Sequence, residues 1–218
     1  SMIVTGLADT HRVIPLSIPQ SSRTGFSLLS SDQTGITFTN RLDLRRGVIN
    51  QNLMNGSGVA AGDIDGDGLC DLYFCGLDSQ NALYRNLGNW RFQDITMSAG
   101  VACAGQLSTG ATFADMNGDG FLDLLVTALG NGTRLFVNDG KGRFREALDS
   151  GLIQRYGSRT MTLADADGDG DLDLYVANYR TTTVRDSPVS VKVKKVNGQW
   201  EVPAEHQERF FATSGDNN

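Results

Sequence analysis

The chain carries three copies of a nine-residue acidic loop, and this repeat constrains the fold more than any other feature. The copies begin at Asp63, Asp115 and Asp165, so they recur after 52 and then 50 residues. Oxygen-bearing side chains occupy positions 1, 3, 5 and 9 of each copy, and glycines at positions 4 and 6 allow sharp backbone turns. Together with a backbone carbonyl at position 7, this donor set suits Ca²⁺, a hard cation that takes six to eight oxygen ligands.

The predicted calcium ligands occupy the same positions in every copy. They are Asp63, Asp65, Asp67, Leu69 and Asp71 in the first loop, Asp115, Asn117, Asp119, Phe121 and Asp123 in the second, and Asp165, Asp167, Asp169, Asp171 and Asp173 in the third. The seventh residue of each loop would act through its backbone carbonyl. We therefore expect Ca²⁺ as the cofactor, with about three ions, one for each acidic loop.

An EF-hand is the first alternative, and its spacing does not match. That loop requires a bidentate Glu at position 12, where this chain has Phe74, Val126 and Val176. Short apolar β runs follow the ninth loop residue instead, at 72–75, 124–127 and 174–177. Apolar or small residues also precede the loops, at 59–62, 111–114 and 161–164. The repeating unit is therefore strand, acidic loop, strand, and the ion would close a β-hairpin.

The repeat extends beyond the loops. Residues 83–94 and 135–146 follow the first two loops at identical spacing, and each reads as a strand, an Asn/Gly turn and another strand. One repeat is thus four short strands in about 51 residues, which is typical of a β-propeller blade. We predict an all-β protein made of four-stranded antiparallel blades with calcium-binding loops.

The two ends of the chain depart from this pattern. Gly25–Leu29 resembles the last strand of a blade, whereas the third repeat loses its pattern after Ala177. Alternating residues around Asn197-Gly198 predict an inserted β-hairpin with a type I′ turn. The expected domains are an N-terminal segment at 1–23, blades at 24–180 with repeats at about 50–98, 101–150 and 152–180, and the hairpin with a truncated remainder of the third blade at 181–218.

Propellers generally close with four to eight blades, so we expect the ring to be incomplete in this chain. An open stack exposes sheet edges that promote aggregation. Either a missing remainder of the chain or self-association with a partner would complete the ring, and the sequence leaves both open.

The charge and hydropathy patterns restrict the partners and the compartment. Twelve of the 25 acidic residues lie in the three loops, which accounts for the net charge of −6 and disfavours binding to nucleic acid. No apolar run reaches the roughly 18 residues that a membrane span needs. Extracellular calcium modules bind at about 10⁻⁴–10⁻³ M, too weakly for cytosolic calcium levels. We therefore expect an extracellular, cell-surface or periplasmic location.

Three cysteines do not make a disulfide framework. Cys70 and Cys75 flank one predicted strand at odd separation, so their side chains point to opposite faces. Either one internal bridge that includes Cys103 forms, or all three remain buried or semi-buried thiols.

These motifs resemble the FG-GAP/VCBS repeats of integrin-like β-propellers. The resemblance rests on Gly58–Tyr73 with Asn86, Gly88 and Phe92 downstream. More narrowly, Thr34–Asn40 and Asp173–Asn178 are similar to secreted bacterial relatives of cartilage acidic protein, which often carry a C-terminal ASPIC/UnbV domain that is not visible here. The resemblance implies an extracellular or cell-surface binding scaffold in which Ca²⁺ is a structural ion.

Three functional hypotheses follow. The first is a secreted calcium-binding module that recognises an extracellular protein or polysaccharide, as in adhesion, and has no catalytic residues. The second is part of a polysaccharide lyase or glycoside hydrolase, for which the chain offers few candidate bases, since His11 and His206 both lie outside the repeats. The third is a purely structural spacer, against which exposed Trp90 and Trp200 argue, because Trp is enriched at binding hot spots.

Overall fold

The computed structural model describes residues 25–43, 51–152, 156–178 and 194–201. Most of its regular structure is antiparallel β-sheet, which confirms the all-β prediction. One four-stranded sheet has the order β1 (Val59–Gly62), β2 (Asp71–Phe74), β3 (Ala82–Asn86) and β4 (Phe92–Asp94). The next has the order β5 (Ser108–Ala114), β6 (Asp123–Ala128), β7 (Gly132–Asn138) and β8 (Phe144–Glu146). Strands β9 (Ser158–Ala164) and β10 (Asp173–Asn178) form a two-stranded third sheet.

Each acidic loop joins the first two strands of its sheet, as predicted. The residue before the loop pairs with the ninth loop residue in all three cases: Gly62 with Asp71, Ala114 with Asp123, and Ala164 with Asp173. The second strand of each sheet therefore begins one residue earlier than its apolar run, because the ninth residue already has a backbone partner across the hairpin.

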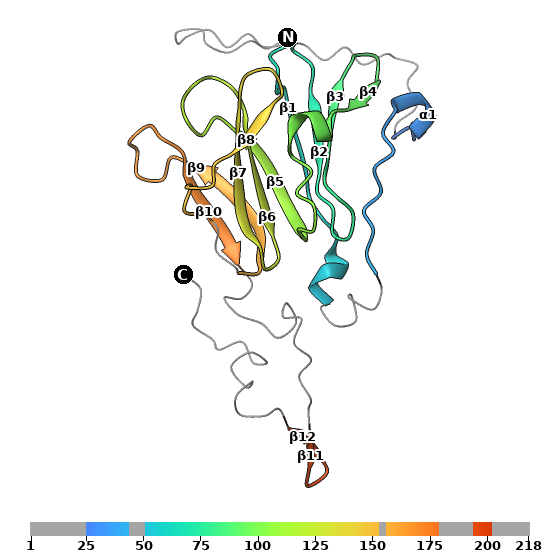
Figure 1. Ribbon diagram of the computed structural model, residues 1–218, viewed down its shortest axis with the longest axis vertical. Coiled ribbons are helices and arrows are strands. Elements are labelled where there is room, and N and C mark those ends of the chain that lie inside the picture. Colours follow the sequence, from blue (N-terminus) through green and yellow to red (C-terminus); the bar gives the residue numbers. More distant parts are fainter. Residues whose placement is uncertain (1–24, 44–50, 153–155, 179–193, 202–218) are drawn as a thin grey trace.

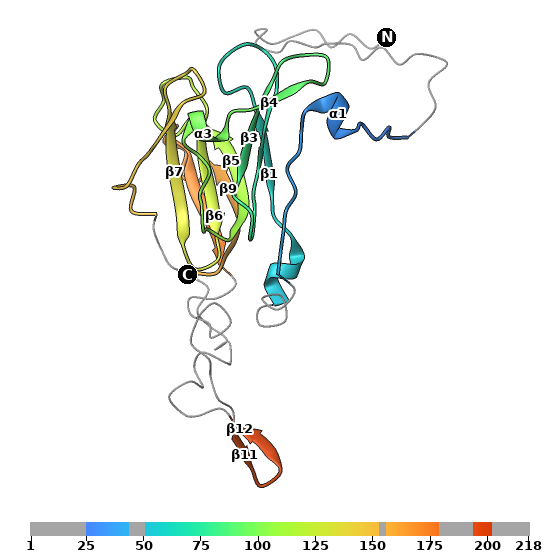
Figure 2. The same cartoon turned by 45° about the vertical axis from the view of Figure 1, so that its right-hand side comes forward.

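The three sheets stand side by side like the blades of a propeller, with their first strands adjacent (Figures 1 and 2). Strand β5 lies between β1 and β9. The approach of the first two blades is close enough to require glycine, since a Cβ on Gly58 would lie only 2.9 Å from the Cα of Gly110. Within the described residues the blades do not close into a ring, and this matches the expectation of an incomplete propeller.

The main hydrophobic core lies between the first and second blades. Its buried residues are Ala60, Ile64, Tyr73, Cys75, Leu83, Ala99, Val101, Cys103, Leu124, Val126 and Phe136. Tyr73 packs edge-on against Phe113 across the blade boundary, with ring centroids 6.4 Å apart. Burial of apolar surface between consecutive blades is what holds such an array together, because a single blade cannot bury both of its faces.

One position in the second strand shows how the neighbouring blade sets burial. Tyr73 on β2 and Leu125 on β6 are both 0% exposed, while the equivalent Tyr175 on β10 is 66% exposed. The first two side chains face the blade that follows in the chain. No described residues cover the corresponding face of the third blade, so the same strand position becomes surface there.

Two short helices precede the first blade, and a third connects the first blade to the second. The chain contains α1 (Ser31–Thr34), the 3₁₀ helix η1 (Gln51–Asn55) and α3 (Thr96–Ala99). Both α1 and α3 end on a left-handed glycine, Gly35 and Gly100, each with φ of 79°. The prediction of a blade-like strand at Gly25–Leu29 is wrong: these residues form no strand, because no described strand lies beside them to pair with.

The predicted hairpin around Asn197-Gly198 is confirmed in its central part. Strands β11 (Lys194–Val196) and β12 (Gln199–Glu201) pair across a turn in which both central residues have positive φ, as a type I′ turn requires. The remainder of this predicted hairpin, and the predicted domain boundaries near 24 and 180, lie outside the described residues. The insertion of this hairpin within the third blade stays a prediction.

The cysteines form no disulfide. Cys75 and Cys103 are buried free thiols and Cys70 is exposed. Burial raises the pKa of Cys75 to about 12. Of the two possibilities open from sequence, the structure has the free thiols, but the expectation that all three are buried or semi-buried is wrong for Cys70. In the described part of the chain, no helix is both long and apolar enough to cross a membrane.

Candidate metal centre

The first residue of each acidic loop organises the loop backbone. Oδ1 of Asp63 accepts a hydrogen bond of 2.8 Å from the Gly66 amide, and Oδ2 accepts one of 2.8 Å from the Gly68 amide. Asp115 and Asp165 make the same contacts with the fourth and sixth residues of their loops. Gly66 and Gly68 have φ of 75° and 83°, a left-handed conformation that favours glycine. The repeated glycines are therefore needed to turn these amides toward the aspartate.

The electrostatic effect of these amides appears at Asp115. Backbone hydrogen bonds, first among them that from Gly120, hold the pKa of the Asp115 carboxyl below its ordinary value. The loop backbone thus favours the charged form of the carboxylate, which is the form that can bind a cation.

The ninth residue fastens the loop to the rest of the blade. Oδ2 of Asp71 accepts the amide of Ile64, and Oδ1 accepts the amide of Asn86 on β3 at 2.7 Å. The second loop repeats this arrangement, because Asp123 accepts amides from Met116 and Asn138. Burial raises the pKa of Asp71 and of Asp123, and these backbone hydrogen bonds partly offset the shift.

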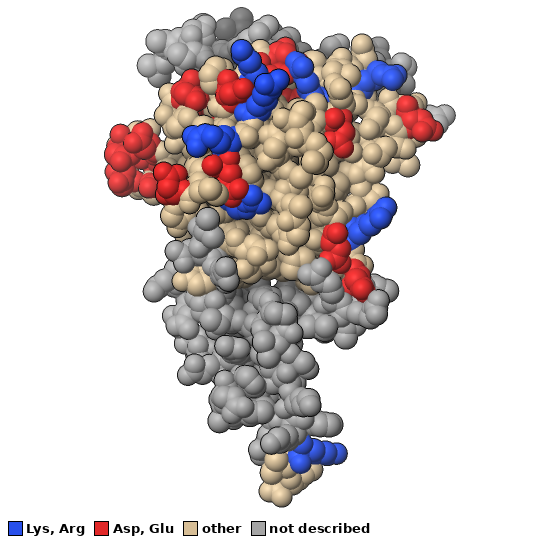
Figure 3. All heavy atoms as spheres, in the orientation of Figure 1, with Lys and Arg blue, Asp and Glu red and all other residues tan. Residues whose placement is uncertain are grey.

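The third loop lacks part of this support. Oδ2 of Asp173 accepts the Ala166 amide at 2.9 Å, as in the other loops. Asp173 is nevertheless exposed, whereas Asp71 and Asp123 are 0% exposed. The cause is the absence, among the described residues of this blade, of a third strand equivalent to β3 or β7. All five acidic side chains of this loop are exposed, and Figure 3 shows an acidic cluster where Figure 1 draws the β9–β10 loop.

The third and fifth residues show where the three loops differ. Oδ1 of Asn117 and Oδ1 of Asp167 each accept the amide of the fifth residue, at 3.0 and 3.2 Å. Asp65 does not make this contact, and its Oδ2 instead lies 2.6 Å from Nη2 of Arg85. The carboxylate of the fifth residue accepts the amide of the seventh in every loop, from Leu69, Phe121 and Asp171.

Two of the loops bring three carboxylates together. Oxygen atoms from each member lie within 4.8 Å of one another in the groups Asp63, Asp65, Asp71 and Asp165, Asp167, Asp173. The second loop has an amide, Asn117, at the third position, so it offers fewer carboxylates. Asp67 and Asp169 belong to the same loops but not to these groups.

The buried carboxylate of Asp65 indicates that a cation fits the first loop. The side chain of Asp65 is only 8% exposed, and its Oδ1 is buried without a hydrogen-bond partner. A buried carboxylate oxygen without a donor is costly, and a hard cation is one partner that would satisfy it. The all-oxygen donor set around it consists of the residue types that Ca²⁺ prefers.

Sequence reasoning missed two kinds of supporting residue. Asn86 and Asn138 donate their amides to the ninth-position aspartates. Both lie at the same place in the repeated segments 83–94 and 135–146, but this spacing did not show that they support the aspartates. No repeated sequence pattern marks Arg85, because the second blade has Val137 at the equivalent position.

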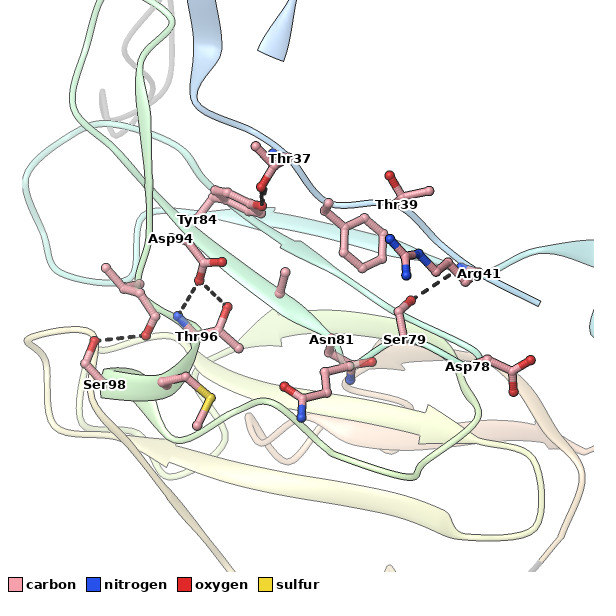
Figure 4. Close-up of a pocket in the computed structure, with 15 residues that line it drawn as sticks. Thr37, Thr39, Arg41, Asp78, Ser79, Asn81, Tyr84, Asp94, Thr96 and Ser98 are labelled. Atoms are coloured by element: carbon pink, nitrogen blue, oxygen red, sulfur yellow. Dashed lines mark hydrogen bonds between the residues drawn. The ribbon is translucent and has the colours of Figure 1, made fainter. Parts of the chain in front are cut away.

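A groove on the first blade is a second candidate site. It has a volume of about 650 Å³ and lies between the segment Thr37–Arg41, the β2–β3 connection and α3 (Figure 4). Eight of its 15 lining residues carry hydroxyl or amide groups. They are contributed by Thr37, Thr39, Ser79, Gln80, Asn81, Tyr84, Thr96 and Ser98.

Hydrogen bonds hold the walls of this groove. The amide of Thr37 donates to Oη of Tyr84 at 3.2 Å. Beside Tyr84, its cross-strand partner Asp94 on β4 accepts the amide and the hydroxyl of Thr96 with its carboxylate. Stacking of Phe38 on Phe74, with centroids 5.2 Å apart, fixes the segment against β2. The result is a preformed groove that combines apolar side chains with several hydrogen-bonding groups.

Comparison with known proteins identifies the repeat. A family model described as an FG-GAP-like repeat matches residues 63–126 and again 115–176. Cartilage acidic protein 1 of Xenopus tropicalis is 32% identical over 113 residues, which cover 50% of this chain and 18% of that protein. The proteins of the same name from Mus musculus and Homo sapiens are 32% and 31% identical over 133 residues, covering 59% of this chain and 21% and 20% of those proteins. The matched region is therefore about a fifth of the relatives' length.

Proposed function

This chain belongs to the FG-GAP-like repeat family, and we propose on that basis that it is a secreted, calcium-binding propeller module that holds a protein or carbohydrate ligand. The module is not an enzyme in this proposal. The proposal rests on one observation. All three loops have the same hydrogen bonds between the first aspartate and the loop amides, and these bonds bring carboxylate oxygens to the same turn of each blade.

The ions would be held by the oxygen atoms already named at positions 1, 3, 5, 7 and 9 of each loop. Calcium bound there would neutralise carboxylates that repel one another when they are close. The role is structural because the loops lie within β-hairpins and their first and ninth residues are fastened to the backbone. Such carboxylates are poor candidates for proton transfer, since their oxygens are engaged by amides or by the ion.

The calcium affinity expected for such loops supports an extracellular location. Modules of this class bind at about 10⁻⁴–10⁻³ M. At free calcium roughly ten times the Kd, each ion stabilises the folded state by about 1.4 kcal/mol, and about three ions contribute on the order of 4 kcal/mol. That amount is a large share of a domain's net stability, so the blades would depend on an environment that is rich in calcium.

Thermal unfolding with and without calcium tests the ion. We expect the melting temperature in millimolar Ca²⁺ to exceed that in EDTA by several degrees. Asp149→Asn is the matched control, because Asp149 is exposed and lies outside the loops. The Asp149→Asn variant should retain the calcium-dependent rise in melting temperature. An equal midpoint in both buffers would refute the calcium proposal.

The groove on the first blade is the proposed ligand surface. Its hydroxyl and amide groups suit a ligand that is itself rich in hydrogen-bonding groups, such as an extended peptide or a polysaccharide. Electrophoretic retardation on acidic and neutral polysaccharides in Ca²⁺ tests this class. Retardation that is lost in Ser79→Trp, which would fill the groove, supports a carbohydrate ligand. Retardation that Ser79→Trp leaves unchanged would place the ligand elsewhere, and shortening of the polymer would refute the non-catalytic proposal.

A further inference from the structure

Arg85 on β3 reaches into the first acidic loop. Its Nη2 lies 2.6 Å from Oδ2 of Asp65 and 3.6 Å from Oδ2 of Asp67. These aspartates occupy the third and fifth loop positions, so one guanidinium contacts two of the carboxylates that a cation in the loop would need. The distance of 2.6 Å is that of a charge-assisted hydrogen bond.

Among the described residues, this contact occurs only in the first blade. Arg85 pairs with Gln93 on β4, and the residue in the same register of the second blade is Val137, which pairs with Arg145. Valine cannot form an ion pair. In the second and third loops, the third residue instead accepts the amide of the fifth residue.

The position of Asp65 shows the effect of Arg85. Asp65 does not accept the Asp67 amide, and that amide donates only to Asp63, at 3.2 Å. The contact with Arg85 leaves Oδ1 of Asp65 buried without a partner, and Nε of Arg85 is buried without one as well. The guanidinium therefore holds the carboxylate in an arrangement that leaves hydrogen-bonding capacity unused on both sides.

We propose that Arg85 is a built-in counter-charge that weakens calcium binding at the first loop relative to the third. The inference rests on the proposed calcium-binding function. The first and third loops gather equivalent carboxylates, from positions 1, 3 and 9. The first loop is more buried and has Leu69 where the third has Asp171, and it alone of these two has a guanidinium on its third-position carboxylate among the described residues. An incoming divalent cation must displace Arg85 from Asp65 or accept its repulsion at short range, and either costs affinity.

Two consequences follow for the molecule. The first loop fills at a higher calcium concentration than the third, so binding is graded along the chain. At low calcium the Arg85 guanidinium also stays paired with the Asp65 carboxylate, which makes the first loop less dependent on the ion. Arg85 is thus a residue that sets the affinity of the site and is not a ligand.

Calorimetric calcium titration of Arg85→Val tests this inference, because valine is the residue that the second blade has in this register. We expect the site in the first loop to tighten by roughly three- to tenfold, with the other sites unchanged. Arg91→Val is the matched control. Arg91 is an exposed cation of the same blade, and its loss should leave every site unchanged. In the Asp65→Ala background, the change caused by Arg85→Val should disappear.

The outcomes separate this inference from the calcium proposal. Calcium binding with unchanged or weakened affinity in Arg85→Val would overturn the role of Arg85 while leaving the calcium sites intact. The absence of any calcium binding in wild type and variants would refute the proposed function itself. Should the valine variant not fold, Arg85→Gln retains a hydrogen-bond donor without the charge and must show the same tightening.

Discussion

The side-chain amide of Asn138 donates a hydrogen bond of 2.8 Å to the carbonyl oxygen of Ile64, which belongs to the first acidic loop. The same Nδ2 donates to the Leu122 carbonyl in the second loop at 2.9 Å. One residue on β7 thus bridges two loops in consecutive blades. Ile64 itself donates its amide to Asp71, so the bridge leads directly to the ninth position of the first loop.

This bridge makes Asn138 important for stability. We expect Asn138→Ala to lower the free energy of unfolding by about 1–3 kcal/mol, because it leaves buried carbonyl groups without a donor. Asn86→Ala is the matched comparison, since Asn86 donates to the exposed carbonyl of Cys70 within its own blade. Its effect should be smaller. Urea unfolding of both variants measures the difference, and equal losses would argue against a special role for the bridge between blades.

The third loop should behave as an independent site. Asp167→Ala is expected to remove one calcium ion and to reduce the calcium-dependent stabilisation by about 1.4 kcal/mol, without changing the other sites. The reason is that this loop is exposed and its contacts are local. Asp65→Ala should likewise remove one ion. Calorimetry gives the number of ions bound, and an unchanged number in Asp167→Ala would contradict the assignment of its ligands.

The cysteines should differ sharply in reactivity. In native protein, a thiol reagent at pH 8 should label only Cys70, which is exposed, and unfolding should reveal Cys75 and Cys103. Burial raises the pKa of both buried thiols, so their reactive thiolate form is suppressed. Labelling of more than one cysteine before unfolding would show that the core between the blades opens.

The raised pKa of Cys75 also predicts a pH dependence. Because the folded value is about 12 and the ordinary value is 9.0, the stability gained by keeping this thiol protonated is complete below pH 9. It is lost as the pH rises toward 12. Cys75→Ala should therefore show a smaller drop in melting temperature than wild type between pH 8 and pH 10.5. An identical drop in the two proteins would exclude this contribution.

Arg134 forms a double hydrogen bond with Glu146, and this pair should stabilise the second blade. Nε donates to Oε1 at 2.6 Å, Nη2 donates to Oε2, and Nη1 donates to Oε1 of Gln106. We expect Arg134→Ala to cost about 2–3 kcal/mol of unfolding free energy, because Glu146 is left partly buried without its cation. Arg145→Ala, which removes an exposed cation from the same blade, should cost less than 0.5 kcal/mol, as is usual for exposed positions. Chemical denaturation compares the two variants, and equal effects would refute the prediction.

Local sequence patterns were enough to predict the loops and most of the strands. Glycines and aspartates at fixed positions define the acidic turn, and the apolar runs beside them define the hairpin, because these depend on neighbours within about ten residues. The same reasoning was wrong at Gly25–Leu29, where the apolar pattern is present and no strand forms. A strand needs a partner to hydrogen-bond with, and local pattern does not supply one.

The sequence by itself determined the repeat, the all-β class and the oxygen-rich composition of each loop. Only the tertiary structure decided that Arg85 lies on Asp65, that Asn138 bridges two blades and that Tyr175 is exposed where Tyr73 is buried. The first two contacts join residues that are 20 and 74 positions apart in the sequence. The exposure of Tyr175 depends on whether another blade covers that face of the sheet. The physical reason is that turn geometry is set by adjacent dihedral angles, whereas burial and ion pairing are set by how the finished sheets pack.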